Sequence, residues 1–478
     1  MAMTTPATGT ESENADGQSP PKITPKEVIP FVRPAEAEIE DDRLPSRPLQ
    51  WMLLMGAAAI VGTAAGVVGA AFRMVLNWED DFRYSMIIWA HVHGYHWLMW
   101  AIPCSICALG AGLACWLTQT FAPSTAGSGI PRVEAVLRSH LRPATAHILP
   151  VKFFGGALSI GSGLAMGREG PTVQMGGTIG RIFSDILGRF LAEPWTLMAA
   201  GAGAGLAVAF NAPLAACLFV VEELLHRFSS RVFCATLISC ICGTVMLRMM
   251  LGNTPDFGSP VLGAWSAEVL PEYLVLGALA GLVGVAFNVS LLGTLQLFDR
   301  ASHWPRGAKG AIVGGVVGLI AWFSPAAVGG GDNLAQLAIT EHRALLAILS
   351  MLFIRFALTM GSYGSGAPGG IFAPLLAIGA LLGNGFALIN SDLRHLPFDP
   401  SAFAIVSMAA CFTAIVRSPL TGVVLLLEMT GSWTLILPMM AASVTAYAIP
   451  ELLRNPPIYD SLRERDEMME RMGQKPTL

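Results

Sequence analysis

The sequence predicts an all-α, polytopic membrane protein, and three observations support this fold class. Hydrophobic residues make up 53% of the 478 residues and charged residues only 13%, and the mean hydropathy of +0.58 is far above that of a soluble globular protein. Several apolar runs reach the length of about 20 residues that a membrane-spanning helix needs. Similar motifs recur at matching positions in two halves of the chain.

Two kinds of apolar segment alternate along the chain. Some runs carry no Asp, Glu, Lys or Arg and are long enough to span a membrane: Trp51–Phe72, Trp97–Thr118, Tyr273–Phe298, Gly310–Gly331 and Met429–Pro450. Others are interrupted: Phe153–Gly167 stops at a GREGP motif, Pro194–Val221 breaks at Asn211–Pro213, and Phe356–Ser391 breaks at Ser365–Gly370. Broken membrane helices need protein or water around their free backbone groups, so they usually line a substrate path.

An internal repeat relates the two halves. Three anchors recur in the same order at offsets of 202, 203 and 206 residues: Gly127–Pro131 with Gly329–Asn333, Gly167–Pro171 with Gly370–Pro374, and Asn211–Cys217 with Arg417–Val423. We therefore predict membrane repeats at residues 51–250 and 265–460, with a transporter site at their interface. These anchors alone leave open whether the repeats are inverted or parallel.

The ends of the chain are polar. Residues 1–50 hold 9 acidic and 5 basic residues, which accounts for the whole net charge of -4, and we interpret them as a disordered cytosolic tail. Residues 461–478 are predicted to be a short cytosolic tail. The electrically balanced body gives no indication of nucleic-acid binding. The eight cysteines all lie in apolar segments, so neither disulfides nor a metal site is expected.

The charged connections predict how the chain is oriented in the membrane. Arg132, Arg138, Arg142 and Lys152 cluster in one predicted connection, whereas Glu79, Asp80 and Asp81 dominate the preceding one. The positive-inside rule places the basic connection in the cytosol.

Glycine and proline mark helix N-termini aimed into the membrane. Helix-like runs begin at Pro131, Pro171 and Pro374, where proline loses no hydrogen bond, and glycine before each lets the backbone approach a ligand closely. Free N–H groups and the helix dipole at such ends favour an anion. The other residues of these motifs are Gly127, Gly129, Gly167, Arg168, Gly170 and Gly370.

Two hydroxyl groups near these motifs are candidate donors to an anion. Ser128 precedes one helix start, although a serine there is equally typical of an N-cap. Tyr459 offers a phenol, although an aromatic anchor at the membrane interface is the alternative.

Two glutamates are candidate titratable groups. Glu169, within the GREGP motif, lies between apolar segments, so it is a functional candidate unless it pairs with the adjacent Arg168. An ionised Glu169 can occupy an anion site and a protonated one can leave it, which makes it a candidate proton-operated gate. Its repeat counterpart, Phe372, cannot titrate. Glu222 has a counterpart in Glu428 and suits a structural role, whereas Glu223 is the better functional candidate, with a solvated helix end as the alternative.

Together these motifs resemble the CLC family of chloride channels and chloride/proton antiporters. The similarity covers about residues 50–460 and rests on GSGIP at Gly127–Pro131, GREGP at Gly167–Pro171, GGIFAP at Gly369–Pro374 and the late Tyr459. The resemblance implies an α-helical homodimer in lipid with two inverted repeats and one pore per subunit. With only 18 residues after Asp460, we expect none of the paired nucleotide-binding domains of many members, and a bacterial inner-membrane location.

The resemblance also implies residue roles. Chloride would be coordinated by Ser128, Tyr459 and the backbone amides of Ile371 and Phe372. Glu169 would be the external gate and Glu223 the internal proton-transfer group. A carboxylate at position 223 is typical of exchangers, and serine at position 128 of chloride-preferring members. No cofactor is implied.

Two alternatives remain at this point. A chloride channel without proton coupling would carry the same motifs. An intramembrane serine hydrolase at Gly361–Gly366 would need a histidine base, and the nine histidines lie in connections or near segment ends.

The HVHGYH segment (His91, His93, His96) resembles an interfacial loop more than a metal site or pH sensor.

Overall fold

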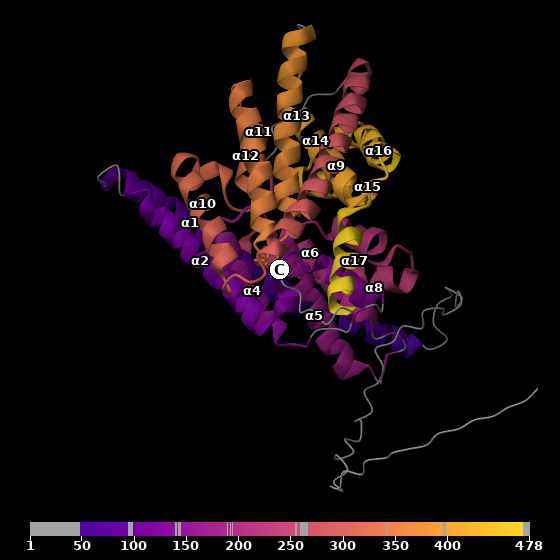
Figure 1. The fold of residues 1–478 in the computed structure, drawn as a ribbon. Coiled ribbons are helices and arrows are strands. Elements are labelled where there is room, and N and C mark those ends of the chain that lie inside the picture. Colours follow the sequence, from indigo (N-terminus) through magenta and orange to yellow (C-terminus); the bar gives the residue numbers. More distant parts are fainter. Residues whose placement is uncertain are drawn as a thin grey trace, which may run out of the picture. The chain divides into compact units, whose positions relative to one another are not determined.

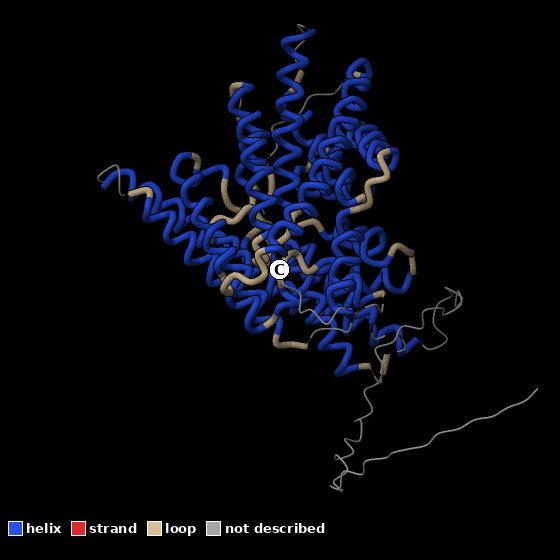
Figure 2. The backbone as a smooth tube through the Cα atoms, in the orientation of Figure 1, coloured by secondary structure: helices blue, strands red, loops and turns tan. Residues whose placement is uncertain are grey.

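The described part of this computed structural model is almost entirely helical. It covers residues 48–471, except for 94–98, 139–140, 142–144, 189, 192, 194, 254–255, 259–265, 342 and 395–397. Figure 2 shows helices joined by loops, and the β pairing of these residues is limited to two isolated bridges. The predicted tail at residues 1–50 lies outside the description apart from its last three residues, and the end of the predicted tail at 461–478 lies outside it from residue 472.

The helices of the first half precede a connecting segment around residue 256 (Figure 1). They are α1 (Pro48–His93), α2 (Ala101–Phe121), α3 (Ile130–Leu137), α4 (Ile148–Gly161), α5 (Glu169–Leu187), α6 (Trp195–Phe210), α7 (Pro213–Phe219) and α8 (Ser230–Leu251), with a π-helical segment η2 (Val220–Leu225) after α7.

The helices of the second half follow that segment. They are α9 (Leu270–Arg300), α10 (Ala308–Phe323), α11 (Asp332–Thr340), α12 (Leu345–Gly364), α13 (Phe372–Arg394), α14 (Pro400–Val416), α15 (Pro419–Thr430), α16 (Ile436–Leu452) and α17 (Ile458–Arg471). Seven helical segments in the described residues are long and apolar enough to cross a membrane, and several shorter apolar helices accompany them. The protein is therefore a multi-pass membrane protein.

The predicted interruptions are confirmed. The backbone turns at Asn211 and Arg417, both with positive φ (51° and 73°), before α7 and α15 begin at prolines. Helix α12 ends at Gly364 and α13 begins at Phe372, which leaves the predicted break at Ser365–Gly370 without helix.

Three predicted boundaries are wrong. The run predicted at Gly310–Gly331 is helical only to Phe323, and the run at Met429–Pro450 is divided between α15 and α16. Residues Glu79–Asp81 lie within the long helix α1 and not in a connection. Composition does not distinguish an apolar helix from an apolar loop, because both avoid water.

Small residues let matching helix pairs pack closely in both halves. An added Cβ on Gly176 of α5 would lie 2.2 Å from the carbonyl oxygen of Gly201 on α6. In the second half, an added Cβ on Gly383 of α13 would lie 2.1 Å from the carbonyl oxygen of Phe403 on α14. Such backbone contact is typical of membrane helices, where small residues at the interface maximise packing.

Two glutamates connect the halves reciprocally. The Glu222 carboxylate accepts the backbone N–H groups of Leu420 and Thr421 at the start of α15, at 3.1 and 2.7 Å. The Glu428 carboxylate accepts those of Leu214 and Ala215 at the start of α7, again at 3.1 and 2.7 Å. The structural role predicted for Glu222 is confirmed, and the crossed contacts are those expected of two related halves that face each other.

Candidate functional site

The loops that precede α3, α5 and α13 meet in the protein interior. Gly167 and Gly370 exchange two backbone hydrogen bonds, at 2.9 and 2.7 Å. Gly127 donates to the carbonyl oxygen of Ala367 at 3.2 Å and accepts from the N–H of Gly369 at 3.0 Å. The three helix N-termini that the glycine-proline motifs predict are therefore gathered at one place.

Proline lies in the first turn of each of these helices. Pro131 is the second residue of α3, Pro171 the third residue of α5 and Pro374 the third residue of α13. Because the first N–H groups of a helix have no partner within it, each helix start offers free donors to the same interior region.

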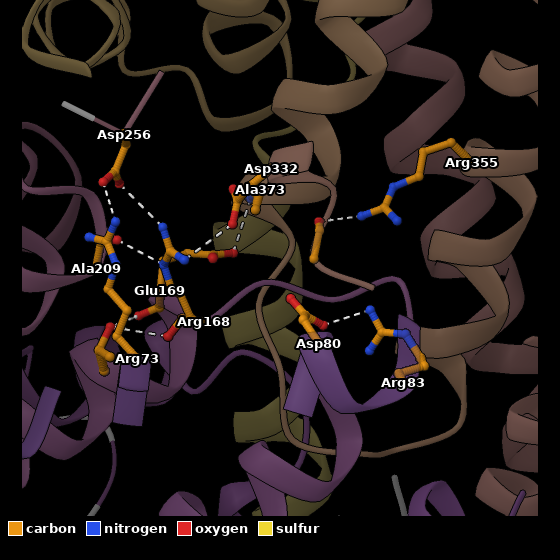
Figure 3. Close-up of polar contacts among 12 residues, drawn as sticks. Arg73, Asp80, Arg83, Arg168, Glu169, Ala209, Asp256, Asp332, Arg355 and Ala373 are labelled. Carbon is orange, nitrogen blue, oxygen red and sulfur yellow. Dashed lines mark hydrogen bonds and ion pairs between the residues drawn. The ribbon is translucent and has the colours of Figure 1, made fainter. Parts of the chain in front are cut away.

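The carboxylate of Glu169 is bound to the N-terminus of α13. One of its oxygens accepts the N–H groups of Phe372 and Ala373 at 2.6 and 3.4 Å, as Figure 3 shows for Ala373. The other oxygen has no hydrogen-bond partner among the described residues, although Glu169 is fully buried. The carboxylate thus lies at the free N–H groups that begin α13, where the helix dipole also favours a negative charge. The two amides lie one residue later than the predicted pair of Ile371 and Phe372.

Arg168 does not pair with Glu169 in the described structure. Its guanidinium lies 3.2 Å from Asp256 and 3.3 Å from Asp332, and it donates to the carbonyl oxygen of Ala209 at 2.9 Å (Figure 3). The alternative interpretation of Glu169 as the ion-pair partner of its neighbour is therefore wrong, because the described ion pairs of Arg168 are with Asp256 and Asp332.

Ser128 and Tyr459 lie next to each other, and both are fully buried. The Ser128 hydroxyl does not cap α3, and apart from their mutual contact neither hydroxyl has a hydrogen-bond partner among the described residues. The Tyr459 ring packs against Phe372, with ring centroids 5.7 Å apart. The N-cap interpretation of Ser128 and the interfacial-anchor interpretation of Tyr459 are both wrong, since α3 has no side-chain cap and both groups are buried in the interior.

Glu223 lies in η2, deep in the protein, and only 4% of its surface is exposed. Its carboxylate accepts a hydrogen bond of 2.6 Å from the Ser418 hydroxyl, just before α15. A solvated helix end is therefore excluded for Glu223. The pairing with Ser418 places this carboxylate at the junction of the two halves.

Lys152 is a site residue that the sequence interpretation misplaced. It lies within α4 and not in a connection, and it is fully buried. Its ammonium group donates to the carbonyl oxygens of Thr125 and Gly127, both at 2.8 Å. Two hydrogen bonds from the Lys152 side chain thus stabilise the loop before α3. A single lysine inside an otherwise apolar run was the sequence feature that could have indicated a buried lysine in a helix.

The remaining motifs are the cysteines, the HVHGYH segment and the Gly361–Gly366 motif. Among the described residues no group of three metal-ligating side chains occurs, and all eight cysteines are free. The His91 ring stacks on Trp322 with centroids 3.6 Å apart, whereas His96 lies outside the described residues. In the Gly361–Gly366 motif, the Ser362 hydroxyl accepts the N–H of Ala165 at 2.9 Å and the Ser365 hydroxyl donates to the Ser362 carbonyl at 2.7 Å.

Comparison with known proteins decides the family. Residues 110–451 match the model of the voltage-gated chloride channel family, which is well over half of the chain. The chain belongs to the voltage-gated chloride channel (CLC) family.

Similar CLC proteins cover most of the chain. The H(+)/Cl(-) exchange transporter ClcA of Salmonella typhi is 38% identical over 435 residues, which are 88% of this chain and 90% of that protein. ClcA of Klebsiella pneumoniae is 39% identical over 426 residues, with 87% and 88% coverage. The crystal structure of a slow cyanobacterial Cl-/H+ antiporter superimposes with a TM-score of 0.81 at 34% identity, covering 87% of this chain and 98% of that one.

The CLC membership settles two points. The all-helical membrane fold predicted from sequence is confirmed. CLC proteins are transporters and not enzymes, so the hydrolase interpretation of Gly361–Gly366 is wrong.

Proposed function

We propose that this protein exchanges chloride for protons across the membrane. The observation that carries the proposal is the bond between the Glu169 carboxylate and the N-terminus of α13, because one buried group there both titrates and mimics the transported anion.

The exchange follows from competition for the same donors. An ionised Glu169 accepts the N–H groups of Phe372 and Ala373 and excludes chloride. When the carboxylate gains a proton, its attraction for these donors and for the helix dipole falls, and the side chain leaves. Chloride then takes the vacated donors. Partial charges of this kind hold an anion without trapping it, as conduction requires.

The two hydroxyls complete the proposed chloride site. Apart from each other, the buried hydroxyls of Ser128 and Tyr459 have no hydrogen-bond partner among the described residues, and an unsatisfied buried donor is costly unless a ligand takes it. The Tyr459 ring packs against Phe372 at the α13 N-terminus, and the Ser128 hydroxyl lies 2.7 Å from the position of a Cβ added to Gly170 in the first turn of α5. We assign them as donors to chloride. A role for Ile371 stays a prediction.

Glu223 is the proposed proton-transfer group on the opposite side of the site. It is buried, and among the described residues its carboxylate has one hydrogen bond, from the Ser418 hydroxyl, and no ion pair, so it can exchange a proton without breaking one. The ClcA relatives are named as H(+)/Cl(-) exchangers, which supports coupled transport here.

The deciding experiment uses the purified protein in chloride-loaded liposomes, with chloride efflux and proton uptake followed together. We expect chloride to drive protons against their gradient. Glu223→Gln should abolish proton uptake while chloride still flows, and Glu169→Gln should abolish proton uptake and leave chloride flux independent of pH. Chloride flow without proton movement in the unmodified protein would identify a channel instead.

We further propose a homodimer in the bacterial inner membrane, with each subunit carrying its own site. The bacterial ClcA relatives support this location. Light scattering of the detergent-solubilised protein measures the oligomeric state directly, and a mass of one chain would contradict the dimer.

A further inference from the structure

Tyr363 places a third hydroxyl group beside the proposed chloride donors. This residue lies in the last turn of α12, and only 3% of its surface is exposed. Its hydroxyl oxygen accepts the backbone N–H of Ser128 at 3.4 Å. The same oxygen would lie 3.0 Å from a Cβ added to Gly127, so it touches the loop that leads into α3.

The proton of the Tyr363 hydroxyl has no acceptor among the described residues. A phenol carries one donor and can accept as well, and the bond from Ser128 uses only its accepting capacity. Accepting that bond polarises the hydroxyl and makes its own proton a stronger donor. Tyr363 therefore presents an unused, activated donor in a fully buried place.

Neighbouring hydroxyl groups also lack hydrogen-bond acceptors. The hydroxyls of Ser128 and Tyr459 contact each other and have no other partner among the described residues. Because one of them can donate to the other, at least one of their two protons lacks an acceptor, as the Tyr363 proton does. Buried donors without acceptors in one region imply a ligand that accepts hydrogen bonds. A halide ion is such a ligand.

We propose that Tyr363 is a third hydroxyl donor of the anion site and that it sets the preference for small, strongly hydrated anions. The inference rests on the proposed chloride transport and adds a specificity-determining residue to it. The proposed preference has a physical reason. A small anion is stabilised more strongly than a large one by each hydrogen bond that replaces a lost water molecule. The Gly361–Gly366 motif thereby acquires a function that is not enzymatic.

The test compares Tyr363→Phe with the unmodified protein. This variant removes one oxygen atom and keeps the ring. We expect chloride binding, measured by isothermal titration calorimetry, to weaken about tenfold, as for the loss of a hydrogen bond to a charged group. We also expect the affinity ratio of chloride to thiocyanate to fall, since the larger anion depends less on each donor.

A matched control is Tyr273→Phe, because Tyr273 is equally buried but stacks on Phe403, with ring centroids 4.5 Å apart. This variant should leave both affinities unchanged. A purely structural role of Tyr363 would lower the melting temperature without chloride but would not change the affinity ratio. Equal chloride affinity and equal ratio in Tyr363→Phe and the unmodified protein would overturn the inference.

A second measurement leaves Tyr363 in place and so does not depend on the folding of Tyr363→Phe. Infrared difference spectra of the Tyr459→Phe protein, recorded on adding chloride, should show a shifted tyrosine C–O band from Tyr363. No tyrosine signal would overturn the inference. Failure of the unmodified protein to bind or transport chloride would instead contradict the proposed function, so the two failures are distinguishable.

Discussion

Gly370 leaves the space that the Glu169 side chain, the proposed gate, occupies. A Cβ at this position would lie 2.3 Å from the Glu169 carboxylate and 2.9 Å from the backbone nitrogen of Gly170. Real Cβ atoms essentially never make contacts this short. The backbone of Gly170 cannot easily move away, so the Glu169 side chain must move instead. We expect Gly370→Ala to displace the Glu169 side chain from the α13 N-terminus.

The displaced gate has a measurable consequence. Chloride flux through Gly370→Ala in liposomes should lose most of its pH dependence, and proton coupling should fall at least severalfold. The control is Gly315→Ala, because a Cβ there meets its nearest neighbour, Ala108, at an ordinary 3.9 Å. Full coupling in Gly370→Ala would contradict the assignment of Glu169 as the gate.

At the scale of elements, α17 matters because it carries Tyr459 to the site. Its Arg463 lies 3.4 Å from the buried Glu134 carboxylate of α3, which Arg138 approaches at 3.1 Å. Its Arg465 lies 2.8 Å from Asp299 at the end of α9. Ion pairs thus hold α17 against α3 and α9, and they thereby also position Tyr459, which lies in the first turn of α17.

Arg463→Gln should loosen this anchor. Removing one partner of a buried charge is costly, and with Arg138 still present we expect a loss of about 2 kcal/mol in stability. Chloride affinity should fall as well, because Tyr459 is no longer held against Phe372. Thermal unfolding and calorimetry measure the two effects. Arg471→Gln is the control, since its side chain is 82% exposed. An unchanged chloride affinity in Arg463→Gln would show that α17 needs no such anchor.

Asp466 makes the stability of α17 depend on pH. Burial raises the pKa of this carboxyl to about 6, although the nearby Arg465 and Arg132 oppose the rise, and its ordinary value is 3.8. The folded protein therefore holds an extra proton between about pH 4 and 6, and stability falls as the pH rises through this window.

Asp466→Asn should remove that dependence. The variant resembles the protonated group, so we expect no effect at pH 4 and a stabilisation of at most about 3 kcal/mol at pH 7.5. Melting temperatures at the two pH values measure the difference. Equal stabilisation at both pH values would show that the titration of Asp466 is not the cause.

The elements also show what sequence patterns can predict. Glycine-proline motifs located the starts of α3, α5 and α13, because few other residues fit a helix start that approaches another backbone. Composition failed for the end of α10, where an apolar loop continues an apolar helix. Tyr363 was invisible as a site residue because its partner, Ser128, is 235 residues away. No local pattern encodes such a contact.

At the scale of the whole molecule, buried ion pairs join segments that are far apart in the sequence. Asp256, in the segment between the two halves, contacts Arg73 of α1 and Arg168 beside the gate. Arg168 in turn contacts Asp332, the first residue of α11 in the second half. This network (Arg73, Arg168, Asp256 and Asp332) therefore ties both halves and their connection to the residue that precedes Glu169.

Asp256→Asn tests whether the network holds the halves together. The side chains of Arg73 and Arg168 are only 18% and 12% exposed, so loss of the shared carboxylate leaves Arg73 poorly compensated and Arg168 with Asp332 alone. We expect stability to fall by about 3 kcal/mol, as for other broken buried pairs. Because water and salt have little access, the loss should be the same at low and high salt.

Glu341→Gln is the matched control for Asp256→Asn, because the pair of Glu341 with Arg343 is much more exposed and should contribute little. The double variant Asp256→Asn with Arg73→Met adds a second criterion. If the cost of Asp256→Asn comes from uncompensated charge, removing Arg73 as well should restore part of the lost stability. A double variant less stable than the single one would instead mean that each side chain stabilises the fold by packing, and the network would not be the link between the halves.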